Sequence, residues 1–352
     1  MPQNYKQFTQ QLRSRLDPDQ VMLEKAINEE LFSIGYSDVI EYVRYAMKGV
    51  DDTYTQRSRE AGERVKSHLS TGGVNDAVFK YQGSVMTDTH IKGYSDIDLL
   101  VITDKFYSWD SAGVKKVLNE SYAYSYQPMQ LESLRQEQNF SSYAGNALDD
   151  LRGLRLDSER ILQGKYLVCD ITKPKSIKIE NKDLKREVDV VIANWYDDVT
   201  SIVNNKGDNR GIQVYHKHEH AKGKVDFPFV SIDRINRRSA LTSGRLKKMI
   251  RFLKNVKAKS GLNIELSSFD FNAICYDIPT QRYERAIFYE LVPVIYAQLK
   301  RLAEDYSAAS ALTSVDGREF IFNGKPEKLQ SLRNLLTEIE YIILDLKSNR
   351  TL

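Results

Sequence analysis

The sequence predicts an α/β (α+β) protein with two lobes, in which a mixed, mainly antiparallel sheet is followed by a helical C-terminal lobe. Between residues 74 and 200, short runs rich in β-branched residues show the period of two that is typical of half-buried strands. From residue 241 onward, apolar residues recur at helical spacing instead. A chain of 352 residues with 41% hydrophobic residues is long enough to fold as two lobes.

The pattern divides the chain into three segments. We expect N-terminal helices over 1–73, a sheet-bearing domain over 74–200 and a helical domain over 201–352. Within the first segment, a helix is predicted over 18–33 and a long helix over 37–69.

Two stretches have a weaker pattern. Residues 105–160 are rich in Tyr, Ser, Gln and Asn, and we expect them to form helices and loops inserted between strands. Residues 204–211 consist largely of turn-forming residues and are predicted to be a linker.

A short motif near residue 83 carries most of the functional signal. Gly83 and Ser84 are followed twelve residues later by Asp96 and Asp98, and then by the apolar run 99–102. Side chains at i and i+2 share one face of a strand, so the two aspartates point the same way. Glycine permits close backbone approach, and Ser84 offers a hydroxyl and an amide to phosphate oxygens. The motif predicts a phosphate-binding turn beside a strand with two carboxylates.

Paired carboxylates of this kind suit magnesium. Mg²⁺ prefers hard oxygen ligands and takes one or two carboxylates together with substrate phosphates. Two such ions can bind the attacking and leaving oxygens of a displacement at phosphorus. An isolated Asp-x-Asp also occurs on surface strands and in calcium loops, but the Gly-Ser turn and the apolar strand favour a nucleotide site.

A third carboxylate lies in a predicted strand over 186–192, where Asp189 is flanked by valines. An acid among apolar residues is costly to bury unless it is paired or binds a metal. We expect Asp189 to bind the catalytic metal and to help take a proton from an attacking ribose hydroxyl. Glu187 shares its strand face and remains a competing candidate, and an exposed strand edge is the alternative for Asp189.

A basic helix is predicted after Gly244. Its apolar stripe indicates core packing and consists of Leu246, Met249, Ile250, Leu253 and Val256. Lys247, Arg251 and Lys254 form a second, cationic stripe at i, i+4 and i+7. Such a stripe is usually a solvated face, but a triphosphate needs compensating charge beyond two metal ions.

These motifs, taken in order, resemble the DNA polymerase β-type nucleotidyltransferases. Within these they resemble the bacterial cGAS/DncV-like nucleotidyltransferases, which make cyclic oligonucleotide signals in antiphage defence. The narrower resemblance rests on Asn236, the basic helix that follows it and the pair Ser268-Phe269. It implies a nucleotidyltransferase palm domain over 74–200 and a long N-terminal helix that braces both lobes.

The resemblance also implies roles at the metal site. Asp96 and Asp98 would bind two Mg²⁺ ions, with Mn²⁺ as the alternative, and Asp189 would complete the catalytic one. At the donor nucleotide, Gly83 and Ser84 would form the phosphate-binding turn.

The later motifs complete this donor site. Lys254 would bind the β- and γ-phosphates, with Lys247 and Arg251 adding charge. Ser268 would be a neighbouring contact, and the Phe269 ring would stack on the base. For Ser268 and Phe269, capping and packing of the next helix is an equal alternative.

The expected activity is synthesis of a cyclic di- or trinucleotide from NTPs such as ATP and GTP. A ribose hydroxyl attacks an α-phosphate and pyrophosphate leaves. A transferase acting on RNA, protein or a small molecule would need the same metal site and stays open. A catalytically silent nucleotide-binding regulator is the third alternative.

Charge and composition limit the partners. A net charge of +3 gives no strong signal for long DNA or RNA, and two cysteines cannot form a zinc ribbon. No run of about 18 apolar residues and no signal-peptide pattern occur, so we expect a cytoplasmic protein without membrane association. His216, His218 and His220 are expected in a solvated loop. The resemblance adds regulatory proteins from a defence operon as partners.

Overall fold

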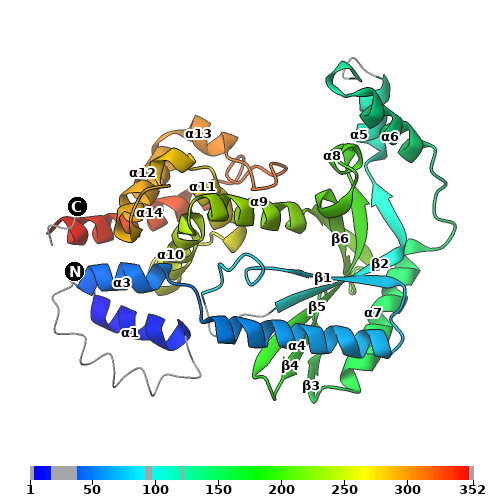
Figure 1. Cartoon of the computed structure of the whole chain (residues 1–352), viewed down its shortest axis with the longest axis horizontal. Coiled ribbons are helices and arrows are strands. Elements are labelled where there is room, and N and C mark those ends of the chain that lie inside the picture. The colour runs from blue at the N-terminus through cyan, green and yellow to red at the C-terminus, as the bar shows by residue number, and fades with distance from the viewer. Residues whose placement is uncertain (1–3, 17–37, 92–96, 120–122, 349–352) are drawn as a thin grey trace. The chain divides into compact units, whose positions relative to one another are not determined.

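The computed structural model describes residues 4–16, 38–91, 97–119 and 123–348 (Figure 1). The chain divides into two compact units that do not follow chain order. Unit 1 comprises Met1–Thr55, Ser84–Ser95 and Asp233–Leu352, and unit 2 comprises Gln56–Gly83 and Asp96–Ile232.

In the described part of unit 2, the strands form one seven-stranded sheet with the order β1-β2-β5-β4-β3, and β6 pairs with both β5 and β7. Only the β2–β5 pair among these is parallel, and the others are antiparallel. This confirms the predicted mixed, mainly antiparallel sheet. The strands are β1 (Ala77–Gln82), β2 (Ile97–Trp109), β3 (Val168–Asp170), β4 (Ile177–Asn181), β5 (Arg186–Asp197), β6 (Gly211–His216) and β7 (Ala221–Asp226).

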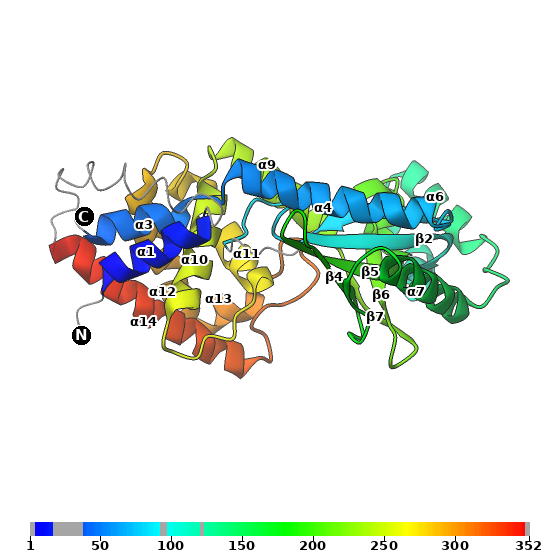
Figure 2. The same cartoon turned by 90° about the horizontal axis from the view of Figure 1, so that it is seen from below.

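One face of this sheet is covered by α4 (Asp52–Thr71) and α7 (Ala147–Gln163), as Figure 2 shows. Gly62 of α4 lies against the ring of Tyr81, and the Tyr81 hydroxyl donates a 2.8 Å hydrogen bond to Glu63. At its C-terminal end, α4 packs on α7, where Gly72 lies against Ile161. Both glycines permit an approach that a larger side chain would block.

The opposite face carries an apolar cluster and, beyond it, the acidic residues. Alternate residues of β2 and β5 contribute buried side chains to this cluster, and Phe229 of α9 (Pro228–Leu241) packs on them. The cluster consists of Leu100, Ile102, Val191, Ala193, Trp195, Ile212 and Phe229. Because the period along a strand is two, Asp98 and Asp189 lie on this same face.

The helical insertion predicted over 105–160 follows β2 but begins later than expected, because β2 continues to Trp109. Val114, Val117, Leu134 and Ile202 form a separate small core between its helices. The helices of this region are α5 (Ser111–Asn119), α6 (Pro128–Gln138), α7 and, after β5, α8 (Val199–Val203).

Unit 1 is helical and has one large core. The apolar stripe of the basic helix is fully buried in it, which confirms the predicted packing. The helices are α1 (Tyr5–Leu16), α3 (Asp38–Met47), α10 (Arg245–Lys259), α11 (Ser268–Tyr276), α12 (Leu291–Glu304), α13 (Tyr306–Ala311) and α14 (Pro326–Ser348). In the described ranges, no helix combines the length and apolar character needed to cross a membrane.

The long helix predicted over 37–69 is wrong, because the chain forms α3 and α4 with a break at 48–51. The Asp51 carboxylate accepts a hydrogen bond from the amide two residues later and so begins α4. The carbonyl of Met47 accepts a 2.9 Å bond from Arg251 instead of continuing α3. The helix predicted over 18–33 lies outside the described residues.

The linker predicted over 204–211 is also wrong, because this stretch is a turn inside unit 2 between α8 and β6. Asp197, fully buried at the end of β5, accepts two hydrogen bonds from Arg210 at 2.8 and 3.0 Å. Lys206 adds an ion pair at 3.2 Å. These contacts hold the turn against the sheet. The sheet continues through β6 to β7, beyond the expected domain boundary at residue 200.

Asp197→Ala should lower the free energy of unfolding by about 3 kcal/mol, because it leaves Arg210 without its buried carboxylate partner. Asp208→Ala is the matched control in the same turn, since its carboxylate is exposed and pairs with Lys80 at the surface. That change should cost less than about 1 kcal/mol. Urea unfolding of both variants measures the difference, and equal losses would contradict the buried-anchor account.

Candidate active site

Two of the predicted carboxylates are direct neighbours in the sheet. Asp98 of β2 and Asp189 of β5 are register partners in the parallel pair. Register partners in adjacent strands project to the same face, so the two carboxylates lie side by side. Both residues are half-buried, and the Asp189 side chain is 19% exposed.

The register also separates Asp189 from its competitor. Glu187 lies on the same face but in the neighbouring row, where it is the partner of Glu180. Its carboxylate makes a 2.6 Å ion pair with Lys178. The sheet therefore pairs Asp98 with Asp189, and Glu187 is held by a cation of β4.

Gly83 directly follows β1, next to Asp98. Its φ is +88°, a conformation that favours glycine. A Cβ at this position would clash with the Oδ2 atom of Asp98. Backbone conformation and close approach thus both require glycine beside this carboxylate.

The polar neighbours of Asp189 include two residues that no sequence motif indicated. The Ser176 hydroxyl donates to its Oδ1 atom at 3.4 Å, and the Lys173 ammonium lies 3.9 Å from the same oxygen. Both belong to the β3–β4 loop, residues 171–176. Only the pairing of β4 with β5 brings this loop to Asp189, and that pairing cannot be read from the sequence.

The residues present fit a divalent metal. Two carboxylates on one face supply the hard oxygen donors that Mg²⁺ prefers, and a lysine ammonium beside Asp189 balances part of their charge. Asp96 lies outside the described residues. Among all the residues that the structure describes, no group of three or more His, Cys, Asp or Glu side chains is arranged to hold a metal.

The predicted phosphate residues of unit 1 are connected with one another. Ser84 begins a turn in which the Thr89 amide donates to the Ser84 carbonyl at 2.9 Å. The Lys254 ammonium donates to the Thr89 carbonyl at 2.8 Å. Arg251 donates to the Asp88 carbonyl at 2.6 Å. The basic helix thus holds the segment that starts with Ser84.

Burial changes the acid–base properties of this helix. Lys254 is 7% exposed and Arg251 is 5% exposed, whereas Lys247 is half-exposed. Burial, and secondarily the Arg251 charge, lower the pKa of Lys254 to about 8. The expected cationic stripe is therefore largely internal, and the Lys254 charge depends on pH near neutrality.

The Ser-Phe pair begins α11. Ser267 caps this helix through the Asp270 amide and carboxylate, and Lys328 pairs with that carboxylate at 2.6 Å. Ser268 is exposed at the first helical position, and Phe269 is half-buried against the core of unit 1. The N-cap is therefore Ser267, one residue before the Ser268-Phe269 pair for which capping was the alternative.

The histidines lie at the β6–β7 turn and do not converge. His216 contacts Glu219 at 3.2 Å, and His220 contacts the Tyr215 hydroxyl at 2.8 Å. His218 is exposed. His218 and His220 lie in the turn, as expected, whereas His216 is the last residue of β6 and is half-buried.

Comparison with known proteins places the chain in a family. Residues 233–343 match the model of the cGAS/DncV-like nucleotidyltransferase C-terminal helical domain. A protein of Capnocytophaga granulosa named c-di-GMP synthase is 48% identical, over 98% of both chains. The chain belongs to the cGAS/DncV-like nucleotidyltransferases. The resemblance seen in the motifs is confirmed.

Further relatives agree with this assignment. A c-di-GMP synthase of a Lachnospiraceae bacterium is 41% identical, over 97% of this chain and 99% of the relative. The solved structure of a STING-associated CdnE c-di-GMP synthase from Flavobacteriaceae sp. has a TM-score of 0.89 and 37% identity, over 99% of this chain and 100% of that chain. The predicted fold class and enzyme class, a nucleotidyltransferase, are therefore correct.

Gly83→Ala should reduce the rate of nucleotidyl transfer about 100-fold, because displacement of a reacting group by about 1 Å has an effect of this size. Gly73→Ala is the matched control, since Gly73 also has a positive φ, +108°, but no atom within 4 Å of an added Cβ. Pyrophosphate release per folded protein measures both variants. Equal rates for the two would show that contact with Asp98 is irrelevant.

The KM for the donor NTP should rise about tenfold per pH unit above pH 8, because the Lys254 ammonium loses its proton there and a neutral amine cannot pair with phosphate. Below pH 8 the ammonium is charged and the KM should be constant. In Lys254→Arg the charge persists and the profile should be flat. Steady-state kinetics from pH 7 to 9 test this, and parallel profiles would exclude Lys254 as the titrating group.

Proposed function

We propose that this nucleotidyltransferase joins two GTP molecules into c-di-GMP. The observation that carries the proposal is the pairing of Asp98 with Asp189 on one sheet face. The names of the relatives at 48% and 41% identity over nearly the whole chain support c-di-GMP as the product.

Asp98 and Asp189 are the proposed metal ligands, together with Asp96. Two bound Mg²⁺ ions, or Mn²⁺, would lower the charge on the α-phosphate and on the attacking and leaving oxygens. Asp189 would also accept the proton of the attacking ribose hydroxyl. Lys173 would balance the Asp189 charge while the site holds no cation.

The donor triphosphate is proposed to bind the turn at Gly83 and Ser84 and the ammonium of Lys254. Because Lys254 already donates to the Thr89 carbonyl, a phosphate oxygen would share or replace that bond. Lys247 and Arg251 would add positive charge on the same helix.

Ser268 and Phe269 complete the proposed donor site. Ser268 is exposed and free to offer its hydroxyl to a phosphate, and the half-buried Phe269 would present part of its ring to the base. Phe269 also packs on the core, so its two roles are compatible.

The proposed reaction consists of two nucleotidyl transfers, and each transfer releases one pyrophosphate. In the first, a ribose hydroxyl of one GTP attacks the α-phosphate of the other, and pyrophosphate leaves. In the second, the free hydroxyl of the linear product attacks the remaining α-phosphate and closes the ring with loss of a second pyrophosphate. Holding both nucleotides together makes each attack effectively unimolecular.

A cyclic dinucleotide implies an effector that binds it. Because the Flavobacteriaceae structure is described as STING-associated, we propose a STING-type receptor as the downstream partner and antiphage signalling as the role. Regulatory proteins encoded beside the enzyme are part of the same proposal.

Asp98→Asn and Asp189→Asn should each reduce c-di-GMP formation by about 100- to 1,000-fold, because each removes a charge that stabilises the transition state. Glu187→Gln is the matched control on the same strand face, and its activity should stay within about threefold of the unchanged chain. The assay uses GTP and Mg²⁺, with mass spectrometry of phosphatase-resistant products.

The same assay separates the proposal from its alternatives. A cyclic product that contains other bases would overturn the choice of GTP. Transfer of nucleotide to RNA or protein without a cyclic product would overturn cyclic-dinucleotide synthesis. Equal loss in Glu187→Gln would contradict the assignment of Asp189 by register.

A further inference from the structure

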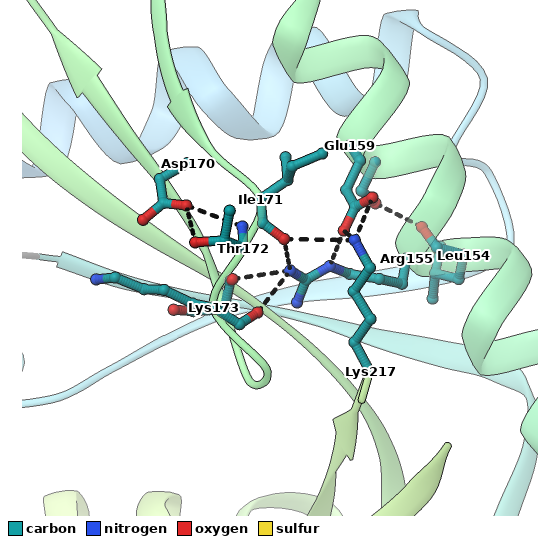
Figure 3. Close-up of polar contacts among 10 residues, drawn as sticks. Leu154, Arg155, Glu159, Asp170, Ile171, Thr172, Lys173 and Lys217 are labelled. Carbon is teal, nitrogen blue, oxygen red and sulfur yellow. Dashed lines mark hydrogen bonds and ion pairs between the residues drawn. The ribbon is translucent and has the colours of Figure 1, made fainter. Parts of the chain in front are cut away.

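A buried arginine of α7 holds the β3–β4 loop. Arg155 is 1% exposed. Its Nη2 atom donates to the carbonyl oxygens of Lys173 at 3.1 Å and Ser176 at 2.9 Å, and its Nε atom donates to Glu159 at 2.7 Å. Figure 3 shows the guanidinium between the loop backbone and the Glu159 carboxylate. Arg155 therefore connects the helix with the loop.

A second cation reaches this loop from the β6–β7 turn. The Lys217 ammonium bonds both carboxylate oxygens of Glu159, at 2.7 and 3.0 Å, and the Ile171 carbonyl at 3.3 Å (Figure 3). The Lys217 amide donates to the Pro174 carbonyl at 2.8 Å. The loop backbone is thus fixed from two separate elements, with Glu159 between the two cations.

The loop fixed in this way carries the neighbours of Asp189. Lys173 and Ser176, whose carbonyls Arg155 holds, place an ammonium 3.9 Å and a hydroxyl 3.4 Å from the same carboxylate oxygen. A shift of the loop would move both groups. The surroundings of Asp189 therefore depend on a residue that does not touch it.

The burial of the Arg155 guanidinium has a cost in free energy that packing alone does not explain. Removing a guanidinium from water costs several kcal/mol, and an apolar contact between helix and loop would be cheaper. The planar guanidinium directs Nε at Glu159 and Nη2 at the two carbonyls at the same time, whereas a lysine has one nitrogen on a flexible stem and cannot reproduce this fixed arrangement. These contacts hold the loop backbone in one geometry.

We propose that Arg155 is a positioning residue for nucleotidyl transfer, which keeps the β3–β4 loop in place so that Asp189 is oriented to bind the divalent metal. The inference rests on the proposed metal-binding role of Asp189. Groups that orient metal ligands typically change metal affinity or activity 10- to 100-fold when they are replaced. Arg155 would act through Ser176 and Lys173.

Arg155→Lys tests this, because it keeps the charge and loses the bridging geometry. Mn²⁺ affinity should fall about tenfold, measured by electron paramagnetic resonance with a GTP analogue that cannot react at its α-phosphate. The Mg²⁺ concentration for half-maximal c-di-GMP formation should rise in parallel, while the KM for GTP at saturating Mg²⁺ stays unchanged. Arg160→Lys is the matched control, since Arg160 is an exposed residue of the same helix.

Ser176→Ala supplies a second variant that affects only an accessible hydroxyl. It should also weaken Mn²⁺ binding, and the double variant with Arg155→Lys should be no weaker than Arg155→Lys alone, because both act on one carboxylate. If Arg155→Lys does not fold, Ser176→Ala still tests the contact between the loop and Asp189 through which Arg155 would act.

The outcomes are distinguishable. Unchanged Mn²⁺ affinity in folded Arg155→Lys, unchanged affinity in Ser176→Ala, or additive effects in the double variant would each overturn the positioning role, with the proposed function intact. An unchanged chain that binds no Mn²⁺ would overturn the proposed function and the inference together.

Discussion

The parallel pairing of β2 with β5 is the constraint on which the site depends. It places Asp98 and Asp189 side by side on one sheet face. Two unit charges 4 Å apart repel by about 4 kcal/mol at an effective dielectric constant of 20, so such a pair needs nearby cations. Lys173 supplies one at 3.9 Å from Asp189, and the proposed metal ions would supply the rest. Gly83 leaves the space that the Asp98 carboxylate occupies.

Buried cations of both units are used to fix backbone. In unit 2, Arg155 bridges carbonyls of the β3–β4 loop, and in unit 1, Arg251 and Lys254 donate to carbonyls of the segment that starts at Ser84. Each segment carries proposed functional groups, and each is otherwise irregular. Because irregular backbone lacks ladder hydrogen bonds, side-chain donors from a neighbouring helix take their place.

The sequence predicted the strands, the helical lobe and the family, because periodicity and short motifs are local. It favoured Asp189 but kept Glu187 as a competitor, since both lie on one strand face, and the register distinguishes them. The sequence predicted that Lys254 lies on a cationic stripe of the basic helix. The structure buries Lys254, because the segment that starts at Ser84 covers it. No sequence motif indicated the proposed role of Arg155, because the residues that it holds in the β3–β4 loop are bound through their backbone carbonyls.

A crystal structure with Mg²⁺ and a GTP analogue that cannot react at its α-phosphate tests the central claim most directly. The account predicts one metal ion bound by the carboxylates of both Asp98 and Asp189. A metal bound without Asp189, whose carboxylate still contacts Lys173 and Ser176 of the β3–β4 loop, would contradict it.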